Sequence, residues 1–511
     1  MGEGMTALEG EQRRAIALIA LLLAFRVWLS AVFPMTGDEA YFVVWGLQPD
    51  WGYYDHPPMV GWMHALLSRF STSQWMLRLP STLLPVIIAA AMYWALRKRD
   101  PRNALYASVA FLLVPINVWN VFVTTDTPLV LFCFLAALAR WKALQERSTT
   151  WHFVAGVFLG LAFLSKYFAV LLALVFVADA VLAPRSEPRW RGLAATFAGA
   201  LPFLAGNAWW NYENCWANLM FNLYNRHEEA GLSWRTPLLF ALIALYVLSP
   251  PALVQAGRAA RALRQRWQDR GFRFLALALA VPLGFFAAVS FVRPVGLHWV
   301  LAFVPFFYMA AALLLSANQL RATVTYLGLF SLLHVAVILV AAALPLETWN
   351  KTRIYDGLVF HFRINDVVRT LERYRPEFEL AADGYSPAVT LTYYSGNYVF
   401  VFGTGSSHAR HDDFLTDVRR YDGRDIAIFR KNAPQADEYQ PYFKSVELRT
   451  LALSGTSFHL VLGRGFDYAA YRDRVLAYVR DRYYQIPAYL PQGRCVFCER
   501  YFSAYCPVRS R

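Results

Sequence analysis

Long apolar runs separated by short polar loops constrain this chain more than any other feature of its sequence. A helix needs about 20 apolar residues to cross a bilayer, or somewhat fewer where it is short or broken, and about eleven runs meet that criterion. Since 57% of the residues are hydrophobic and only 16% are charged, we expect a polytopic membrane protein. The predicted spans are residues 13–33, 80–96, 104–122, 127–144, 151–165, 168–183, 192–210, 237–256, 273–291, 298–316 and 323–344.

The net charge of +14 could indicate a nucleic-acid-binding protein. The positions of the basic residues distinguish that class from a membrane protein. The basic residues lie in short loops after even-numbered spans, such as Arg97-Lys98-Arg99 and the run from Arg258 to Arg270, and no nucleic-acid-binding motif accompanies them. The positive-inside rule therefore places the N-terminus in the cytoplasm. An odd number of spans puts everything after Pro345 outside. The first run follows Arg13 and Arg14 but has the length of a span, so we expect a retained anchor.

The last third of the chain has ordinary charge density and a different pattern. Short β-like runs cover residues 398–402, 425–429 and 458–462, with helix-like stretches at 365–374 and 468–482. The sequence therefore predicts an α-helical transmembrane domain over residues 1–345 and an extracytoplasmic α/β domain over residues 346–511.

Acidic residues gather in the loops that this topology places outside, which points to an external active site. Two of them, Asp38 and Glu39, are adjacent at the outer end of the first span. Adjacent carboxylates at an apolar boundary are costly unless they pair, bind a cation, take a proton or are solvated at the interface, and the last reading is about as good as the others. The outer-loop acids are Asp38, Glu39, Asp50, Asp55, Asp126, Glu213, Glu228 and Glu229.

The first outer loop resembles that of the GT-C glycosyltransferases, in particular the group of protein O-mannosyltransferases and lipid A aminoarabinose transferases. The segment Asp55-His56-Pro57-Pro58 is most similar to the corresponding segment of bacterial enzymes that attach sugars such as galacturonic acid to lipid A or lipopolysaccharide core. The resemblance covers roughly residues 10–345. It rests on Thr36-Gly-Asp-Glu39, Gly52-Tyr-Tyr-Asp-His-Pro-Pro58, Thr124-Thr-Asp-Thr-Pro128, Gly160-Leu-Ala-Phe-Leu-Ser-Lys-Tyr167, Trp209-Trp-Asn-Tyr212 and His298-Trp299.

The resemblance implies an inverting transferase in which Asp38 is the catalytic base, with Glu39 beside it. A carboxylate near the nucleophile can orient or deprotonate an acceptor hydroxyl as the lipid phosphate leaves from the opposite face of the sugar. Asp126 fits a second catalytic acid that orients the acceptor, and a helix N-cap is its alternative reading. Asp38 and Asp126 could also hold a divalent cation, Mg²⁺ or Mn²⁺. No other cofactor is expected.

Cationic side chains should meet the departing phosphate. Lys166 lies between two short apolar runs on the outer side and needs a counter-charge there. We favour the donor phosphate as that partner, and an acid such as Asp126 is the alternative. Snorkelling to lipid headgroups is an equally good reading for each of the other cations. The predicted substrate-binding residues are Asp55, His56, Lys166, Arg226, His227, Arg293 and His298; His56 stands where aminoarabinose transferases carry a lysine.

The C-terminal cysteines Cys495, Cys498 and Cys506 could be a zinc half-site, but no fourth ligand is nearby in the sequence and the predicted compartment is oxidising. We therefore expect a disulfide. Its pairing cannot be deduced from the sequence, and Cys215 is a further candidate partner.

Together these features predict an enzyme of the bacterial inner membrane that moves a sugar from a polyprenyl-phosphate donor to lipid A, lipopolysaccharide core or a related envelope glycan on the periplasmic face. A protein O-mannosyltransferase-like enzyme with a protein acceptor would use nearly the same residues. A non-enzymatic lipid-sugar transporter would carry polar residues through the membrane midplane, whereas this chain carries them at outer helix ends.

Overall fold

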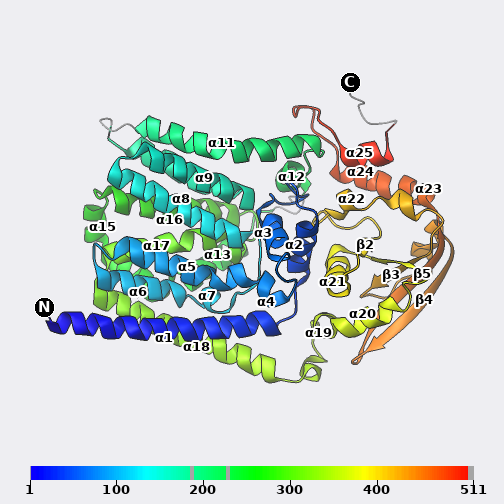
Figure 1. Cartoon of the computed structure of the whole chain (residues 1–511), viewed down its shortest axis with the longest axis horizontal. Helices are drawn as coiled ribbons and strands as arrows, with labels where there is room; N and C mark the ends of the chain where they lie inside the picture. The colour runs from blue at the N-terminus through cyan, green and yellow to red at the C-terminus, as the bar shows by residue number, and fades with distance from the viewer. Residues whose placement is uncertain (1, 185–188, 226–230, 504–511) are drawn as a thin grey trace. The chain divides into compact units, whose positions relative to one another are not determined.

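The computed structural model describes residues 2–184, 189–225 and 231–503 of the 511-residue chain (Figure 1). The chain forms two compact units. The helical unit comprises Met1–Phe33, Ser71–Ala205 and Glu229–Ala343, and the sheet unit comprises Pro34–Phe70, Gly206–Glu228 and Leu344–Arg511. The first outer loop thus belongs to the same unit as the C-terminal third.

Six helices in the described part of the helical unit are long and apolar enough to cross a membrane. They are Leu8–Val32 within α1 (Gly2–Val32), Gln74–Leu96 formed by α4 (Gln74–Leu77) and α5 (Leu79–Leu96), α8 (Asp126–Glu146), α16 (Arg270–Ser290), Leu297–Leu314 formed by η2 (Leu297–Phe303) and α17 (Val304–Leu314), and α18 (Ala317–Ala343). Each corresponds to a predicted span. The multi-pass architecture is therefore confirmed.

The predicted number of eleven spans is not confirmed. Four of the other predicted runs are bent, broken or short, and the fifth lies in a 25-residue helix, Arg189–Glu213, that is not among the six. α13 (Arg235–Leu248) and α14 (Pro250–Arg258) meet at 88° and count as a seventh span only if taken together. Proline lacks the N–H that would continue a helix, so one helix ends before Pro115 and another before Pro250, and a new helix begins at each proline. The remaining helices are α6 (Pro101–Leu112), α7 (Pro115–Trp119), α9 (Thr149–Ser165), α10 (Ala169–Leu182), α11 (Arg189–Glu213) and α15 (Ala260–Arg266).

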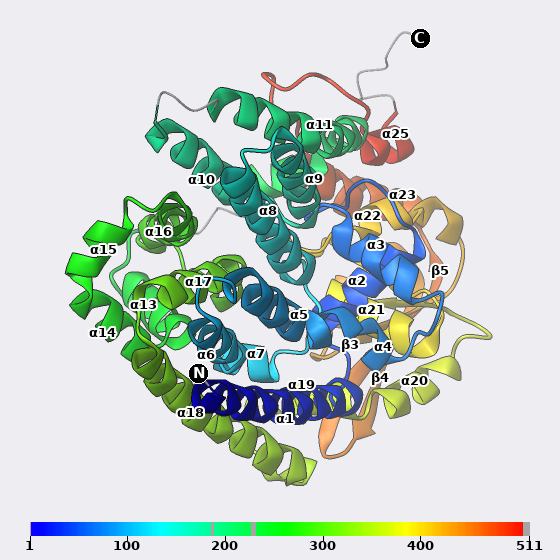
Figure 2. The same ribbon diagram turned by 60° about the vertical axis from the view of Figure 1, so that its left-hand side comes forward.

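Buried polar contacts and close helix approaches hold the helical unit together. Arg26 of α1 is fully buried, and its guanidinium donates to the backbone oxygens of Thr82 and Asn120 at 2.9 Å each. The Asn120 oxygen lies just past the end of α7, where helix carbonyls have no intrahelical donor. α9 lies beside α8 and α11 (Figures 1 and 2). A side chain at Gly156 of α9 would meet the backbone oxygen of Thr196 of α11.

The sheet unit contains a five-stranded mixed sheet in the order β2-β1-β3-β5-β4 (Figure 1). β1 pairs in parallel with β2 and β3, and β5 pairs antiparallel with β3 and β4. The three predicted strands are confirmed as β2, β3 and β5. The sequence did not predict β1, which is short, or β4, an edge strand whose exposed polar residues interrupt the apolar pattern. The strands are β1 (Glu379–Ala382), β2 (Phe400–Val401), β3 (Ile426–Arg430), β4 (Phe443–Leu453) and β5 (Thr456–Phe466).

Helices cover both faces of this sheet because strand side chains alternate between the faces. Ile428 and Val461 pack with residues of α23 (Tyr468–Tyr471), α24 (Ala477–Tyr483) and α25 (Val496–Tyr501). Ala427 and Leu460 pack with residues of α19 (Tyr355–Phe362), α20 (Ile364–Glu372) and α21 (Tyr385–Ser395). The unit also contains α2 (Gly37–Leu47), α3 (Met59–Leu67), α12 (Ala217–Met220), η1 (Phe221–Asn225), η3 (Leu346–Trp349), α22 (Asp412–Leu415), η4 (Val418–Tyr421), η5 (Ala436–Glu438), η6 (Gln440–Tyr442) and η7 (Arg472–Leu476).

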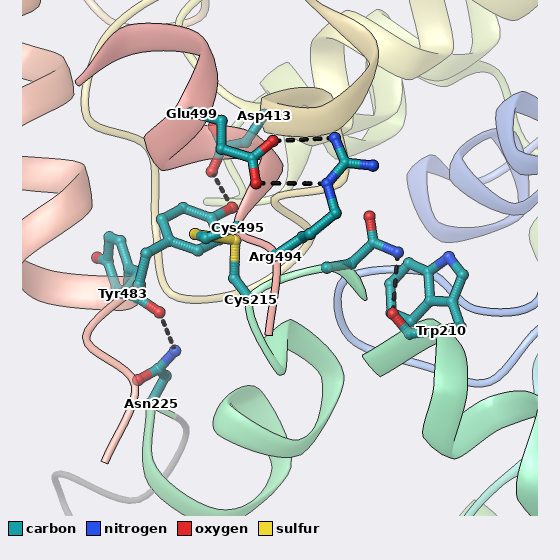
Figure 3. Close-up of a disulfide and its surroundings, with 10 residues drawn as sticks. Trp210, Cys215, Asn225, Asp413, Tyr483, Arg494, Cys495 and Glu499 are labelled. Atoms are coloured by element: carbon teal, nitrogen blue, oxygen red, sulfur yellow. Dashed lines mark hydrogen bonds and ion pairs between the residues drawn. A yellow bond between two sulfur atoms is a disulfide. The ribbon is translucent and has the colours of Figure 1, made fainter. Parts of the chain in front are cut away.

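A disulfide joins Cys215 to Cys495 across 280 residues of sequence (Figure 3). It links the segment 206–228 to the C-terminal region within the sheet unit. The predicted disulfide is therefore confirmed, with the partner from outside the C-terminal cluster. Cys506 lies outside the described residues.

Candidate active site

The two acids of the first outer loop lie in the first turn of α2, where negative charge is favoured by the helix dipole. Thr36 is the N-cap residue, and its hydroxyl accepts a hydrogen bond from the backbone N–H of Glu39 at 3.3 Å. The Glu39 carboxylate accepts in return from the Thr36 backbone N–H at 3.1 Å and from its hydroxyl at 3.0 Å. This reciprocal arrangement is a capping box. Glu39 is 1% exposed, so its carboxylate fixes the start of the helix.

Asp38 differs from Glu39 because its side chain is exposed. Its Oδ1 accepts a hydrogen bond of 3.0 Å from the hydroxyl of Tyr385, the first residue of α21. Burial and the nearby Asp38 charge raise the pKa of Tyr385 above its ordinary value, so the phenol stays protonated and remains a donor. Within the described part of the chain, this hydroxyl is the donor that orients the Asp38 carboxylate.

Asp55 is 7% exposed and is held by a relay of hydrogen bonds. The Tyr41 hydroxyl donates to Asp55 Oδ1 at 3.1 Å and accepts from the backbone N–H of His411 at the same distance. Burial and the Asp55 charge raise the pKa of Tyr41 well above its ordinary value. His411 Nδ1 in turn accepts from the backbone N–H of Tyr54, and burial lowers the pKa of this histidine to about 3. The ring is therefore neutral at physiological pH.

The turn that contains His56 is built on aromatic packing. Tyr53 stacks on Trp45 with ring centroids 4.3 Å apart, and its backbone N–H donates to the His56 oxygen at 3.0 Å. The His56 ring lies 6.3 Å from the Trp45 ring. Gly61 accommodates Tyr53, since a side chain there would meet the phenol. The aromatic residues of this loop are thus structural at Trp45 and Tyr53, both fully buried.

In the helical unit, Asp126 and Lys166 form a buried ion pair. Lys166 Nζ donates to both carboxylate oxygens of Asp126, at 2.9 and 2.8 Å, and the two residues are 6% and 3% exposed. Asp126 opens α8, and Lys166 lies at the break after α9. His298 Nε2 lies 4.0 Å from Asp126 Oδ2 and its side chain is 53% exposed. The acid that we considered as the alternative partner of Lys166 is thus a partner in the structure.

The other predicted cationic residues are Arg293, Arg226 and His227. Arg293 follows α16, and its guanidinium lies 5.9 Å from the ring centre of Trp299, the residue after His298. Arg226 and His227 lie outside the described residues. Among the residues that the structure describes, no group of three or more His, Cys, Asp or Glu side chains is arranged to hold a metal ion.

Sequence reasoning missed Tyr385, Tyr41 and His411 as parts of the site. Tyr385 and Asp38 are 347 residues apart, and no local pattern marks this tyrosine. His411 lies 370 residues from Tyr41. The two contacts become visible only once the first loop and the C-terminal third fold into one unit.

Comparison with known proteins agrees with the resemblance that the first outer loop indicated. A family profile described as dolichyl-phosphate-mannose-protein mannosyltransferase matches residues 55–210, a range that includes Asp55, His56, Asp126 and Lys166. The lipid A galacturonosyltransferase RgtD of Rhizobium johnstonii is 29% identical over 277 residues, which is 52% of this chain and 58% of that protein. The chain thus matches less than two thirds of this relative's length.

Two crystal structures of ArnT from Cupriavidus metallidurans share the fold. The apo structure has a TM-score of 0.61 at 15% identity, over 89% of this chain and 98% of ArnT. The structure bound to undecaprenyl phosphate has a TM-score of 0.58 at 14% identity, over 87% and 97% of the two chains. The resemblance that the first outer loop indicated is confirmed, and the chain shares the fold of ArnT.

Proposed function

We propose that this protein is an inverting glycosyltransferase that moves a sugar from a polyprenyl-phosphate donor to lipid A, lipopolysaccharide core or a related envelope glycan. The observation that carries the proposal is the exposed carboxylate of Asp38, oriented by the Tyr385 hydroxyl at 3.0 Å. The neighbouring acids Glu39 and Asp55 are buried. ArnT binds undecaprenyl phosphate, and RgtD is named for transfer to lipid A, so both support the donor and the acceptor class.

Asp38 acts as the general base. The acceptor hydroxyl loses its proton to the free oxygen of Asp38 while its own oxygen forms a bond to the anomeric carbon. The bond from that carbon to the lipid phosphate oxygen breaks, and the lipid phosphate leaves from the opposite face, so the product is inverted. Tyr385 keeps the carboxylate in one orientation, which reduces the entropy lost when the acceptor binds. Glu39 serves this chemistry indirectly, by fixing the first turn of α2.

Lys166, Arg293 and His298 form the proposed phosphate-binding set of the helical unit. The Lys166 ammonium is held by Asp126, so its orientation is fixed before a donor binds. His298 is exposed beside the same pair and can donate to a phosphate oxygen. Asp126 thus acts through Lys166 by positioning it. A requirement for Mg²⁺ or Mn²⁺ is tested by assaying transfer in excess chelator, and none of the steps above uses a metal.

We propose a location in the bacterial inner membrane, with the N-terminus in the cytoplasm and the sheet unit in the periplasm. The basic runs Arg97-Lys98-Arg99 and Arg258 to Arg270, which this orientation places in the cytoplasm, support it. The disulfide between Cys215 and Cys495 also supports an oxidising compartment for the sheet unit.

Mass spectrometry of lipid A and core oligosaccharide, from cells with and without the gene, tests the function. A mass difference of one sugar residue in either fraction is the expected result. The family profile is described by transfer to protein, so glycopeptides from secreted proteins of the same cells are compared in parallel. A sugar lost only from glycopeptides would replace the lipid acceptor with a protein acceptor. No change in any fraction would refute the proposal.

A further inference from the structure

A cavity of about 270 Å³ lies within the sheet unit at the carboxyl ends of β1 and β2. Asp383, Gly384 and Tyr385 follow β1 and line one side. The loop after β2 lines another side through Gly403, Gly405, Ser406, His408 and Ala409. Side chains from η7, α24 and α25 complete the wall. The exposed residues of the lining include Ser406, so the loop after β2 forms the mouth of the cavity.

The topology of the sheet favours a ligand at this edge. From β1 the chain crosses through α21 to β2 on one side of β1, and then returns through α22 and η4 to β3 on the other side. All three strands are parallel, so their carboxyl ends share one edge. Ligands of open α/β sheets bind in the crevice outside the carboxyl ends, where successive connections run in opposite directions. The cavity lies outside the carboxyl ends of β1 and β2, and no described residue of its lining directly follows β3.

The charges in the lining disfavour an anionic ligand. The lining contains three aspartates and one arginine, Arg410. This arginine is 6% exposed and forms two bonds with Asp413, from Nε at 2.9 Å and Nη2 at 3.2 Å. Its Nη1 donates to the backbone oxygen of Ser406 at 3.0 Å and also to that of Thr404. Arg410 therefore anchors the loop and is largely occupied. The carboxylates are also engaged, since Asp413 pairs with Arg410, Asp383 pairs with Arg430 at 3.2 Å, and burial raises the pKa of Asp412 to about 6. Because the arginine of the lining is occupied, a neutral ligand is favoured over an anion.

The remaining lining suits a neutral sugar ring. Sugars combine hydroxyl groups, which donate to carboxylates, with apolar faces that pack on aromatic rings. The cavity offers Asp383 with Tyr385 and Ser406 on the polar side, and Phe497 with Tyr501 among its aromatic residues. Its volume is below the roughly 300–1,000 Å³ of sites for drug-sized ligands, which suits a single ring.

One residue connects the cavity to the proposed chemistry. Tyr385 contributes to the lining, and its hydroxyl donates to Asp38. We propose that this cavity is the acceptor subsite, where a neutral sugar ring of the acceptor glycan binds beside the catalytic base. The assignment rests on the proposed glycosyl transfer and specifies where its acceptor is recognised.

Two adjacent serines of the loop give a matched test. Ser406 lines the cavity and Ser407 does not. In Ser406→Trp the indole should block the mouth of the cavity. The KM for the acceptor should then rise roughly 10-fold or more, which is the size of effect that steric changes in a binding pocket produce. The KM for the donor should be unchanged. Ser407→Trp, which adds the same indole one residue away, keeps both constants near wild type. Equal acceptor KM values in wild type and Ser406→Trp would overturn the assignment.

Binding to the purified full-length protein gives a second readout that needs no turnover. Saturation-transfer NMR should show contact with methyl glucoside or methyl galactoside but not with methyl galacturonate, and Ser406→Trp should lose the signal. Contact only with the galacturonate, or with neither class of probe, would also overturn the assignment. Slow hydrolysis of the donor, measured without acceptor, separates the proposed transferase activity from the proposed subsite because it does not require acceptor binding. A wild-type protein that consumes no donor under any condition refutes the transferase itself, whereas donor consumption with an unaffected Ser406→Trp refutes only the subsite.

Discussion

Replacement of Lys166 by alanine should destabilise the helical unit strongly, because it leaves the Asp126 carboxylate buried without its partner. Both oxygens of Asp126 accept from Lys166 Nζ, and the side chains are 4% and 8% exposed. Removing one member of a buried ion pair costs about 3–5 kcal/mol, since the other charge stays desolvated. The double variant Lys166→Ala/Asp126→Ala removes that charge as well, so it should recover most of the loss.

Cys133 provides the assay. It lies in α8 with Asp126 and is a buried free thiol, so a thiol-reactive dye reports when this helix unfolds on heating. Lys142→Ala is the matched control on the same helix. Lys142 forms an exposed pair with Glu146 at 3.8 Å, and its ammonium lies 4.0 Å from the ring centre of Trp151. The loss of both contacts should cost about 1 kcal/mol. A Lys166→Ala protein that unfolds at the same temperature as Lys142→Ala would refute a structural ion pair.

Three further predictions concern the sheet unit. His411 is neutral in the fold with a pKa of about 3, so the stability it confers is complete above pH 6.5 and is lost as the pH falls toward 3. Thermal unfolding should show about 2 kcal/mol more loss from pH 6.5 to pH 5 in wild type than in His411→Asn, which keeps an acceptor for Tyr54; equal losses would contradict this reading. Cys495→Ser should lower stability by about 2–5 kcal/mol, and adding Cys215→Ser should change little more because the bond is already absent, so an additive second loss would argue against the pairing. A reporter active only in the periplasm and fused at the C-terminus should be active, whereas activity of a cytoplasmic reporter there would reverse the proposed orientation.

Features encoded in short stretches of sequence could be predicted. Apolar runs identified the six long helices, and alternating apolar residues identified β2, β3 and β5. The residues around Asp38 and Asp55 were sufficient to indicate the GT-C group. In each case the residues that form the pattern lie within about 20 residues of one another, so a single short segment is enough to indicate the structure.

Features that depend on tertiary contacts could not be predicted. The preference for phosphate as the partner of Lys166 rested on the family resemblance, which places this turn beside the active-site loop. The fold places Asp126 against Lys166 from 40 residues away. The different roles of the acidic residues Asp38 and Glu39 in the first loop could not be predicted either. Only the capping box shows that Glu39 fixes the helix start while Asp38 stays exposed. Tyr385 reaches Asp38 because the first loop folds with the C-terminal third, which hydropathy does not encode.

Turnover of Asp38→Asn tests most directly whether Asp38 is the catalytic base. The variant keeps the shape of the side chain and its bond from Tyr385, so the protein should fold and insert normally. Transfer from a polyprenyl-phosphate sugar to the acceptor should fall by at least about 10²-fold, the lower range for losing a positioned acid–base group. Asp437→Asn makes the same change at another exposed aspartate of the sheet unit and should retain full activity. Near wild-type transfer by the Asp38→Asn protein would contradict the account.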